Sequence, residues 1–200
     1  MSKPFQVGIT GSIGSGKSLI CKIFMTLGVP VYDADSHAKK LMTTDGILIS
    51  GIKKEFGDLA YHGDGSLNRK YLAEHVFHDE GKLQRLNQLV HPRVAVDYSN
   101  WVEKHQRFPY VLKEAALLFE SGSHKALDRI IVVHAPVEMR IQRVLKRDAR
   151  TVEQIRAIVE KQMPDDEKLN RADDIVVNDE SVLLIPQVLK LHNEFIGHRK

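Results

Sequence analysis

The sequence is poor in the features that mark several large classes of protein. One cysteine, Cys21, among 200 residues excludes a disulfide framework and a zinc site built from several cysteines. No apolar run approaches the ~18 residues that a membrane span needs, and the start at Met1–Pro4 has no signal-peptide core. We therefore expect a protein of the reducing cytoplasm that has no membrane partner.

Charge and turn-forming residues are also present in ordinary amounts. The net charge of +3 is too small to favour a nucleic-acid partner, and no feature of the sequence indicates a protein partner. Counts of 13 glycines and 7 prolines exclude collagen-like and linker-like chains. Hydrophobic residues make up 42% of the chain, which is enough to build one globular core.

Short β-rich runs alternate with helical patterns, and this order predicts an α/β fold with a parallel sheet covered by helices. We expect five strands, at residues 5–10, 29–32, 110–114, 129–134 and 175–178. Helices are expected over 17–27, ending at Gly28, over 137–147, and from 181 to the end. Thr151 and Gln154 form a capping-box pattern that opens another helix, which Pro164 would end.

Residues 34–106 contain no predicted strand and are too long for a simple crossover, so we interpret them as an inserted helical subdomain. Asp45 and Asn68 are placed to cap helices within it. The His91-Pro92 pair interrupts another apolar helical stripe.

The first predicted strand leads into a glycine-rich motif. Residues Gly11–Ser18 fit G-x-x-x-x-G-K-[ST], the phosphate-binding loop that joins a strand to a helix. Backbone N–H groups of such a loop face phosphate oxygens, Lys17 supplies a cation for the β- and γ-phosphates, and the Ser18 hydroxyl ligates Mg²⁺. We expect the following residues to bind ATP: Gly14, Ser15, Gly16, Lys17, Ser18 and Leu19.

The phosphate loop predicts a nucleoside triphosphate ligand. Other patterns in the sequence indicate which class of phosphate-loop protein this is. A GTPase needs a guanine-reading Asn-Lys-x-Asp, which is absent from the sequence. A small kinase then fits best, with a core of residues 1–33, 107–136 and 165–200, an acceptor-binding subdomain at 34–106 and a helical lid at 137–164.

Two aspartates follow the second predicted strand, at the edge of the sheet where ligands of open α/β folds bind. Asp33 is therefore the candidate base or orienting group for an acceptor hydroxyl. For Asp35 a functional role and a role as the N-cap of the helix expected to begin near His37 are equally favoured.

The phosphate loop together with Asp33-Ala34-Asp35 resembles the dephospho-coenzyme A kinase family. Further family motifs follow in order along residues 5–190. They are Gly65–Arg69, Val76-Phe77, Leu89–Pro92, Leu117–Glu120, Arg147-Asp148, Gln162, Ala172-Asp173 and Asn178. Three positions depart from the family pattern, with Leu19 in place of Thr, Lys39 in place of Arg and Ala116 in place of Pro.

The resemblance implies transfer of phosphate from ATP to the ribose 3′-hydroxyl of dephospho-CoA, with Mg²⁺, giving CoA and ADP. It also implies that Asp33 accepts or orients the proton of that hydroxyl. Lys39, Arg69 and His91 would contact the acceptor. The alternative for Arg69 is that it is an ordinary surface arginine. The alternative for His91 is that the His91-Pro92 pair only kinks a helix.

Other charged residues are candidates for the same site. Glu114 ends the third predicted strand and could hold Mg²⁺ through water, or be a solvent-exposed strand end. Arg140, Arg143 and Arg147 share one face of a predicted helix, which suits a lid over the phosphates or a solvated basic surface. We expect Arg140 to be the catalytic one.

The histidines of the sequence do not predict a zinc site. His75 and His78 lack a third zinc ligand, so we expect both at the surface.

Two other functions are compatible with the motifs. One is a different small-molecule or nucleoside monophosphate kinase on the same core. The other is a regulator that binds ATP without transferring phosphate, which the presence of Lys17, Ser18 and Asp33 disfavours.

Overall fold

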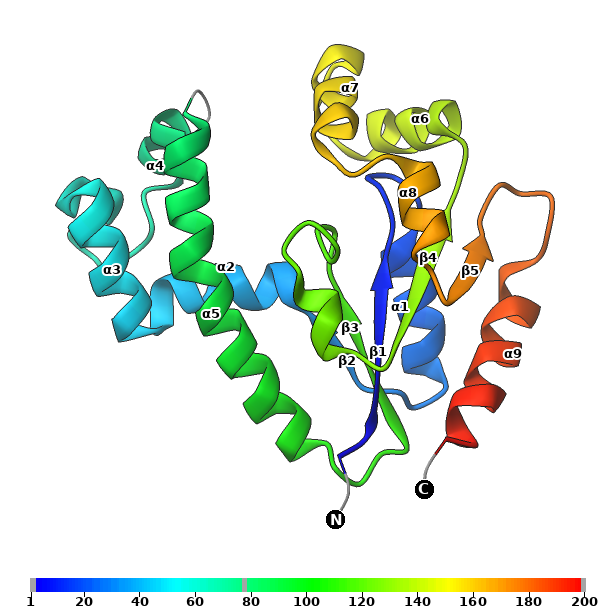
Figure 1. Cartoon of the computed structure of the whole chain (residues 1–200). Coiled ribbons are helices and arrows are strands. Elements are labelled where there is room, and N and C mark those ends of the chain that lie inside the picture. Colours follow the sequence, from blue (N-terminus) through cyan, green and yellow to red (C-terminus); the bar gives the residue numbers. More distant parts are fainter. Residues whose placement is uncertain (1–2, 77–78, 199–200) are drawn as a thin grey trace. The chain divides into compact units, whose positions relative to one another are not determined.

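The computed structural model describes residues 3–76 and 79–198 and contains a five-stranded parallel sheet (Figure 1). Its strands are β1 (Phe5–Thr10), β2 (Val31–Asp33), β3 (Tyr110–Glu114), β4 (Arg129–His134) and β5 (Asp174–Val177). The order across the sheet is β2-β3-β1-β4-β5, so β1 lies in the middle. The expected α/β fold class is confirmed, and three of the strands have the expected bounds.

Helices connect and flank these strands. They are α1 (Lys17–Thr26), α2 (Ala34–Thr44), α3 (Gly46–Phe56), α4 (Arg69–Val76), α5 (Glu80–Lys104), α6 (Val137–Arg147), α7 (Val152–Lys161), α8 (Asp165–Asn170) and α9 (Leu184–Ile196). Two short 3₁₀ turns, η1 (Asp58–Ala60) and η2 (Ser123–Ala126), complete the elements.

The expected helix caps are confirmed. Asp45 accepts a hydrogen bond from the Leu48 N–H at 2.9 Å at the start of α3. Asn68 accepts one from the Tyr71 N–H at 3.2 Å at the start of α4. Thr151 and Gln154 form the complete capping box of α7.

Three expectations about helices were wrong. Helix α5 continues through Pro92, because a proline within a long helix removes one hydrogen bond that other packing can outweigh. Helix α2 begins at Ala34 rather than near His37, and the last helix begins at Leu184 rather than Ser181. The helix that Thr151 opens does end before Pro164, and Pro164 then precedes a further helix, α8, that we had not predicted.

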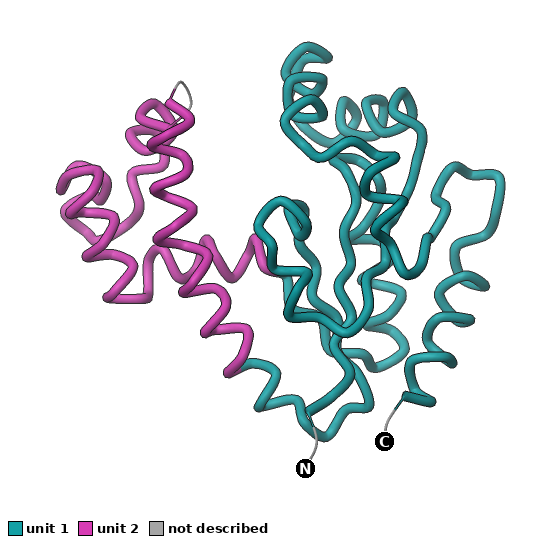
Figure 2. The backbone as a smooth tube through the Cα atoms, in the orientation of Figure 1, with its two compact units in different colours: residues 1–33, 101–200 teal, residues 34–100 magenta. Residues whose placement is uncertain are grey.

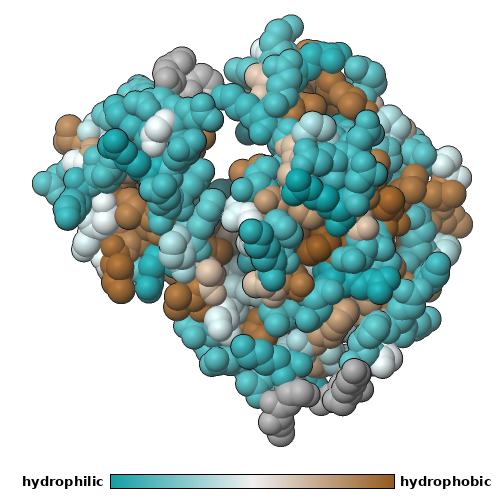
Figure 3. Space-filling view, viewed as in Figure 1, coloured by the Kyte–Doolittle hydropathy of each residue, from teal (hydrophilic) through white to brown (hydrophobic). Residues whose placement is uncertain are grey.

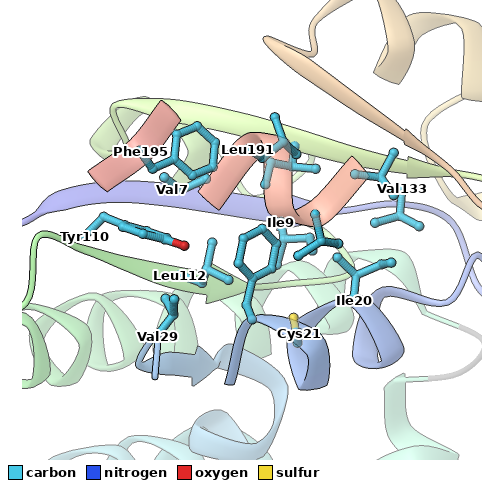
Figure 4. Packing of buried hydrophobic residues seen from close by; sticks show 14 residues of the cluster. Val7, Ile9, Ile20, Cys21, Val29, Tyr110, Leu112, Val133, Leu191 and Phe195 are labelled. Atoms are coloured by element: carbon cyan, nitrogen blue, oxygen red, sulfur yellow. The ribbon is translucent and has the colours of Figure 1, made fainter. Parts of the chain in front are cut away.

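One face of the sheet carries the main core (Figure 4). Side chains that alternate along the strands, such as Val7 and Ile9, meet side chains of α1 and α9 in a single cluster. Leu191 and Phe195 come from α9, and Cys21 comes from α1. Because α1 and α9 pack against β1 in this cluster, the two elements that flank the β1–α1 turn are held in place by the core.

The opposite face of the sheet is packed closely over the same strand. A Cβ atom added to Gly8 would lie 2.7 Å from Leu127 Cδ1 and 2.8 Å from Leu118 Cδ2. Both leucines belong to the connection between β3 and β4. A side chain at position 8 would therefore require these leucine side chains to shift, since real Cβ contacts are not that short.

The chain divides into two compact units (Figure 2). The first holds the sheet and comprises residues 1–33 and 101–200, and the second is the helical segment Ala34–Asn100. The boundary between the two units falls at residue 100, inside α5, and the extent of the expected subdomain at 34–106 stays a prediction. The expected lid, 137–164, clusters with the first unit.

The surface of the molecule is mixed in character. The face in Figure 3 is mainly hydrophilic, with hydrophobic side chains gathered in separate patches. Among the described residues, no helix combines the length and the apolar character needed to cross a membrane.

Candidate active site

The phosphate loop lies between the buried strand β1 and the first turn of α1. Gly14 and Gly16 both have positive φ, of 78° and 98°, which other residues rarely adopt. A Cβ on Gly14 would lie 2.5 Å from the Arg140 carbonyl oxygen, and one on Gly16 would lie 2.1 Å from Asn178 Nδ2. Both glycines are therefore required by backbone conformation and by neighbours that approach closely.

The lysine and the serine of the motif stand at the start of α1. Lys17 Nζ donates a hydrogen bond to the Gly11 carbonyl at 2.8 Å, so its side chain folds back along the loop. Ser18 Oγ donates to Glu114 Oε1 at 3.4 Å. The loop serine and the carboxylate at the end of β3 are therefore neighbours, although they are 96 residues apart in the sequence.

Two carboxylates end adjacent strands at this edge of the sheet. Asp33 of β2 is paired in register with Glu114 of β3, and Glu114 is also paired with Ile9 of β1. Parallel strands bring their carboxyl ends to one edge, which is where open α/β sheets bind ligands. Asp33, Glu114, Lys17 and Ser18 thus occupy one edge of the first unit.

Asp35 differs from Asp33 in local structure. It is the second residue of α2, inside the first helical turn, so it does not occupy the N-cap position expected from the sequence. A carboxylate within the first turn still stabilises the helix, because it faces the positive end of the helix dipole.

Cys21 is buried beside the same edge. It is 3% exposed, one helical turn after Lys17 and Ser18. Burial raises the pKa of its thiol, and the Glu114 carboxylate that it contacts raises the pKa further. The protonated thiol is therefore a packed, unreactive group.

Side chains from α8 and from the residue after β5, to which we had assigned no role at the site, form hydrogen bonds with the phosphate loop. Ser12 Oγ donates to Asp165 Oδ1 at 2.6 Å and accepts from Lys168 Nζ at 3.2 Å. Asn178 Nδ2 donates to the Ser15 carbonyl at 2.7 Å. Lys168 is 1% exposed, and burial lowers its pKa while the nearby Glu120 and Asp165 carboxylates oppose that change.

The signals for these residues were present in the sequence but weak. Pro164 followed by Asp165, Asp166 and Glu167 is a helix-start pattern, and it marks α8. Asn178 stood out only through the family resemblance. No local pattern brings either one to the loop, because the contacts span 153 and 163 residues of sequence.

The three arginines of α6 have different surroundings. Arg140 is 1% exposed, donates to the Ala135 carbonyl at 3.0 Å and pairs with Asp165. Arg143 donates to the Asn178 carbonyl at 3.0 Å, and Arg147 pairs with Asp148 at 2.8 Å in solvent. The helix bears out the spacing that puts the three arginines on one face of α6, but each guanidinium has a different partner, and Arg140 is buried whereas Arg147 is exposed.

The proposed acceptor contacts lie on the second unit. Lys39 is exposed on α2, Arg69 is exposed at the start of α4, and His91 is exposed on α5. They therefore stand on three different helices of the inserted segment.

Within residues 3–76 and 79–198, no group of three or more His, Cys, Asp or Glu side chains could hold a metal ion. His75 is partly buried and its ring nitrogen lies 2.8 Å from the Tyr71 carbonyl, so it is not simply a surface residue. His78 and Phe77 lie outside the described residues.

Comparisons with known proteins agree with this architecture. The family profile of dephospho-CoA kinase matches residues 5–183. A dephospho-CoA kinase from Bacteroides fragilis is 37% identical over 186 residues, covering 93% of this chain and 90% of its own.

Solved structures are similar over the whole chain. TT1252 from Thermus thermophilus is 34% identical with a TM-score of 0.86, and the match covers 96% of this chain and 98% of that one. A dephospho-CoA kinase from Campylobacter jejuni is 26% identical with a TM-score of 0.72, covering 98% of both chains. On the sequence match, the fold and the phosphate loop together, the chain belongs to the dephospho-CoA kinase family.

Proposed function

We propose that this protein transfers the γ-phosphoryl group of ATP to the ribose 3′-hydroxyl of dephospho-CoA, giving CoA and ADP. Family membership supports this activity and its two substrates. The observation that carries the mechanism is the meeting of the phosphate loop, Glu114 and Asp33 at adjacent strand ends.

Residues of the loop bind the donor. Backbone N–H groups of the loop at Gly14 and Gly16 and at the N-terminus of α1 face the phosphates, since this geometry concentrates N–H donors and positive helix dipole at one point. The N–H groups of Ser15 and Leu19 donate to the Ser12 and Gly16 carbonyls instead. Lys17 exchanges its bond to the Gly11 carbonyl for phosphate oxygens and stabilises the charge of the transition state.

Asp33 acts on the acceptor. It ends β2 beside Glu114, so its carboxylate accepts or orients the proton of the attacking 3′-hydroxyl. Lys39, Arg69 and His91 contribute acceptor contacts from the second unit, and a lysine at position 39 meets phosphate as a point charge.

The oxygen ligands present fit Mg²⁺. Ser18 Oγ and Glu114 Oε1, 3.4 Å apart, are the hard donors that this ion prefers, with Glu114 acting through water. When bound, the ion neutralises negative charge on the phosphates.

Arg140 fits a supporting role better than the direct contact that we first expected. Its guanidinium is buried against Asp165 behind the loop, so it holds the loop and adds positive charge beneath it. A cytoplasmic location, expected from the single cysteine, stays a prediction.

The test is a comparison of acceptors in a coupled assay of ADP release. Dephospho-CoA, AMP, CMP and shikimate are each supplied with ATP and Mg²⁺. We expect turnover with dephospho-CoA and little with the others. Efficient turnover of AMP or shikimate in its place would indicate another small-molecule kinase, and ATP binding without turnover on any acceptor would indicate a regulator.

A further inference from the structure

Ile13, a residue of the phosphate loop, is in contact with two helices much later in the chain. Its partly buried side chain packs against a small cluster of buried residues, Ile141, Val144 and Ile155. Two of these belong to α6 and one to α7, and the two helices pack against each other (Figure 1). This cluster is separate from the main core between the sheet, α1 and α9.

The backbone of Ile13 is held from the same side. Its N–H donates a hydrogen bond to Gln162 Oε1 at 2.9 Å, at the end of α7. Its carbonyl accepts a bond from Arg140 Nη1 at 3.5 Å. The donor, the acceptor and the side chain of one loop residue are thus all occupied by α6 and α7 and the residue that ends α7.

The next residue is fitted to the same helix. The Arg140 backbone approaches Gly14 so closely that a Cβ there would lie 2.5 Å from the carbonyl oxygen. The helix pair therefore rests directly on the loop, and a shift of α6 must displace the peptide planes on both sides of Gly14. Those planes set the direction of the N–H groups that would face phosphate.

We infer that Ile13, together with Gln162, is a positioning residue that couples the packing of α6 and α7 to the geometry of the phosphate loop. In this role the Ile13 side chain packs on α6 and α7, and the Gln162 side chain bonds the loop backbone. They act by holding the loop in the conformation in which its N–H groups converge. The inference rests on the proposed function, because it takes the loop to be the site of ATP binding.

Truncation of Ile13 tests the coupling. In Ile13→Ala the side chain no longer fills its place in the cluster, and residue 13 loses one of its three attachments to α6, α7 and Gln162. We expect about tenfold weaker ATP binding by equilibrium titration without acceptor, and a KM for dephospho-CoA within about twofold of wild type. Ile13→Val should recover most of the ATP affinity.

A matched control separates positioning from general destabilisation. Leu191→Ala removes the same number of carbons from the main core on α9, far along the chain from the loop. We expect it to lower the melting temperature at least as much as Ile13→Ala while changing ATP affinity less than about twofold.

Gln162→Met provides a second, independent variant. It keeps the length of the side chain but removes the acceptor for the Ile13 N–H, and it decides the matter if Ile13→Ala does not fold. We expect about fivefold weaker ATP binding. ATP affinity within about twofold of wild type in Gln162→Met, or in a folded Ile13→Ala, would overturn the inference. If wild type binds ATP but does not phosphorylate dephospho-CoA, the proposed function fails while this comparison of affinities still stands.

Discussion

Asp33 and Asp35 lie two residues apart but belong to different elements. Asp33 ends β2 at the edge of the sheet, whereas Asp35 lies in the first turn of α2. We therefore propose different roles for the two carboxylates, that of Asp33 on an acceptor hydroxyl and that of Asp35 at the helix terminus.

Replacing each aspartate by asparagine separates these roles. Asp33→Asn keeps the shape of the side chain and loses its basicity, so we expect kcat to fall about 10²–10⁴-fold with little change in ATP affinity. Asp35→Asn should reduce kcat much less. An inactive Asp35→Asn beside an active Asp33→Asn would show that the roles are assigned the wrong way round.

Lys17 is the second residue whose chemistry can be isolated. Its ammonium bonds the Gly11 carbonyl within the loop and is not part of the hydrophobic core. We expect Lys17→Ala to lower kcat by about 10³-fold or more, because charge on the transferring group is then unmet. Circular dichroism should show an intact fold, and unchanged kcat in that folded protein would contradict the mechanism.

At the scale of elements, α6 packs directly against the phosphate loop at Ile13 and Gly14. Its three arginines have side-chain exposures of 1%, 27% and 63% for Arg140, Arg143 and Arg147. This gradient along one helix predicts that the same substitution will have very different effects at its two ends.

We expect Arg140→Met to destabilise the protein by about 3 kcal/mol, because it removes the buried guanidinium that pairs with Asp165 and leaves Lys168 as the cation near that carboxylate. Arg147→Met is the matched control and should cost less than about 1 kcal/mol, since its pair with Asp148 is exposed to solvent. Urea unfolding measures both. Equal effects at the two positions would mean that Arg140 is not a structural part of the loop's support.

Elements defined by local patterns could be predicted from the sequence. Short β-rich runs placed β1, β3 and β4 at their observed bounds, and the caps at Asp45 and Thr151 were found because they depend on residues three positions apart. Helix α5 could not be predicted across Pro92, since tertiary packing there outweighs the local cost of proline.

The candidate site also contains residues that local patterns predict and residues that only tertiary packing brings together. Lys17 and Ser18 belong to a contiguous motif, and Asp33 and Glu114 follow from the rule that parallel strands end at one edge. Lys168 and Asp165 could not be placed beside the loop, because their contacts join distant parts of the chain through packing. The burial of Arg140 was missed for the same reason.

At the scale of the whole molecule, a contact between β3 and α9 links stability to pH. The Tyr110 hydroxyl and His192 Nδ1 are 2.6 Å apart, and Tyr110 is 1% exposed. Burial lowers the pKa of His192 below its ordinary value. The folded protein therefore favours neutral His192, whose contribution is complete above the unfolded pKa of about 6.5 and is lost as pH falls through the folded pKa.

The comparison of wild type with His192→Gln isolates this contribution. Glutamine keeps a neutral acceptor and does not titrate, so other acidic groups cancel in the difference. We expect the free energy of unfolding of wild type to fall relative to His192→Gln between about pH 7.5 and pH 5.5. Urea unfolding at both values measures it, and a difference independent of pH would show that His192 keeps an ordinary pKa.

The central claim is phosphoryl transfer to one particular hydroxyl of dephospho-CoA. The most direct measurement is phosphorus NMR of the product formed by the purified protein from ATP, Mg²⁺ and dephospho-CoA, with Lys17→Ala as the control. The account predicts a new phosphomonoester signal at the ribose 3′ position that appears together with ADP and is absent with Lys17→Ala. Phosphate released only as inorganic phosphate, or attached at another position, would contradict it.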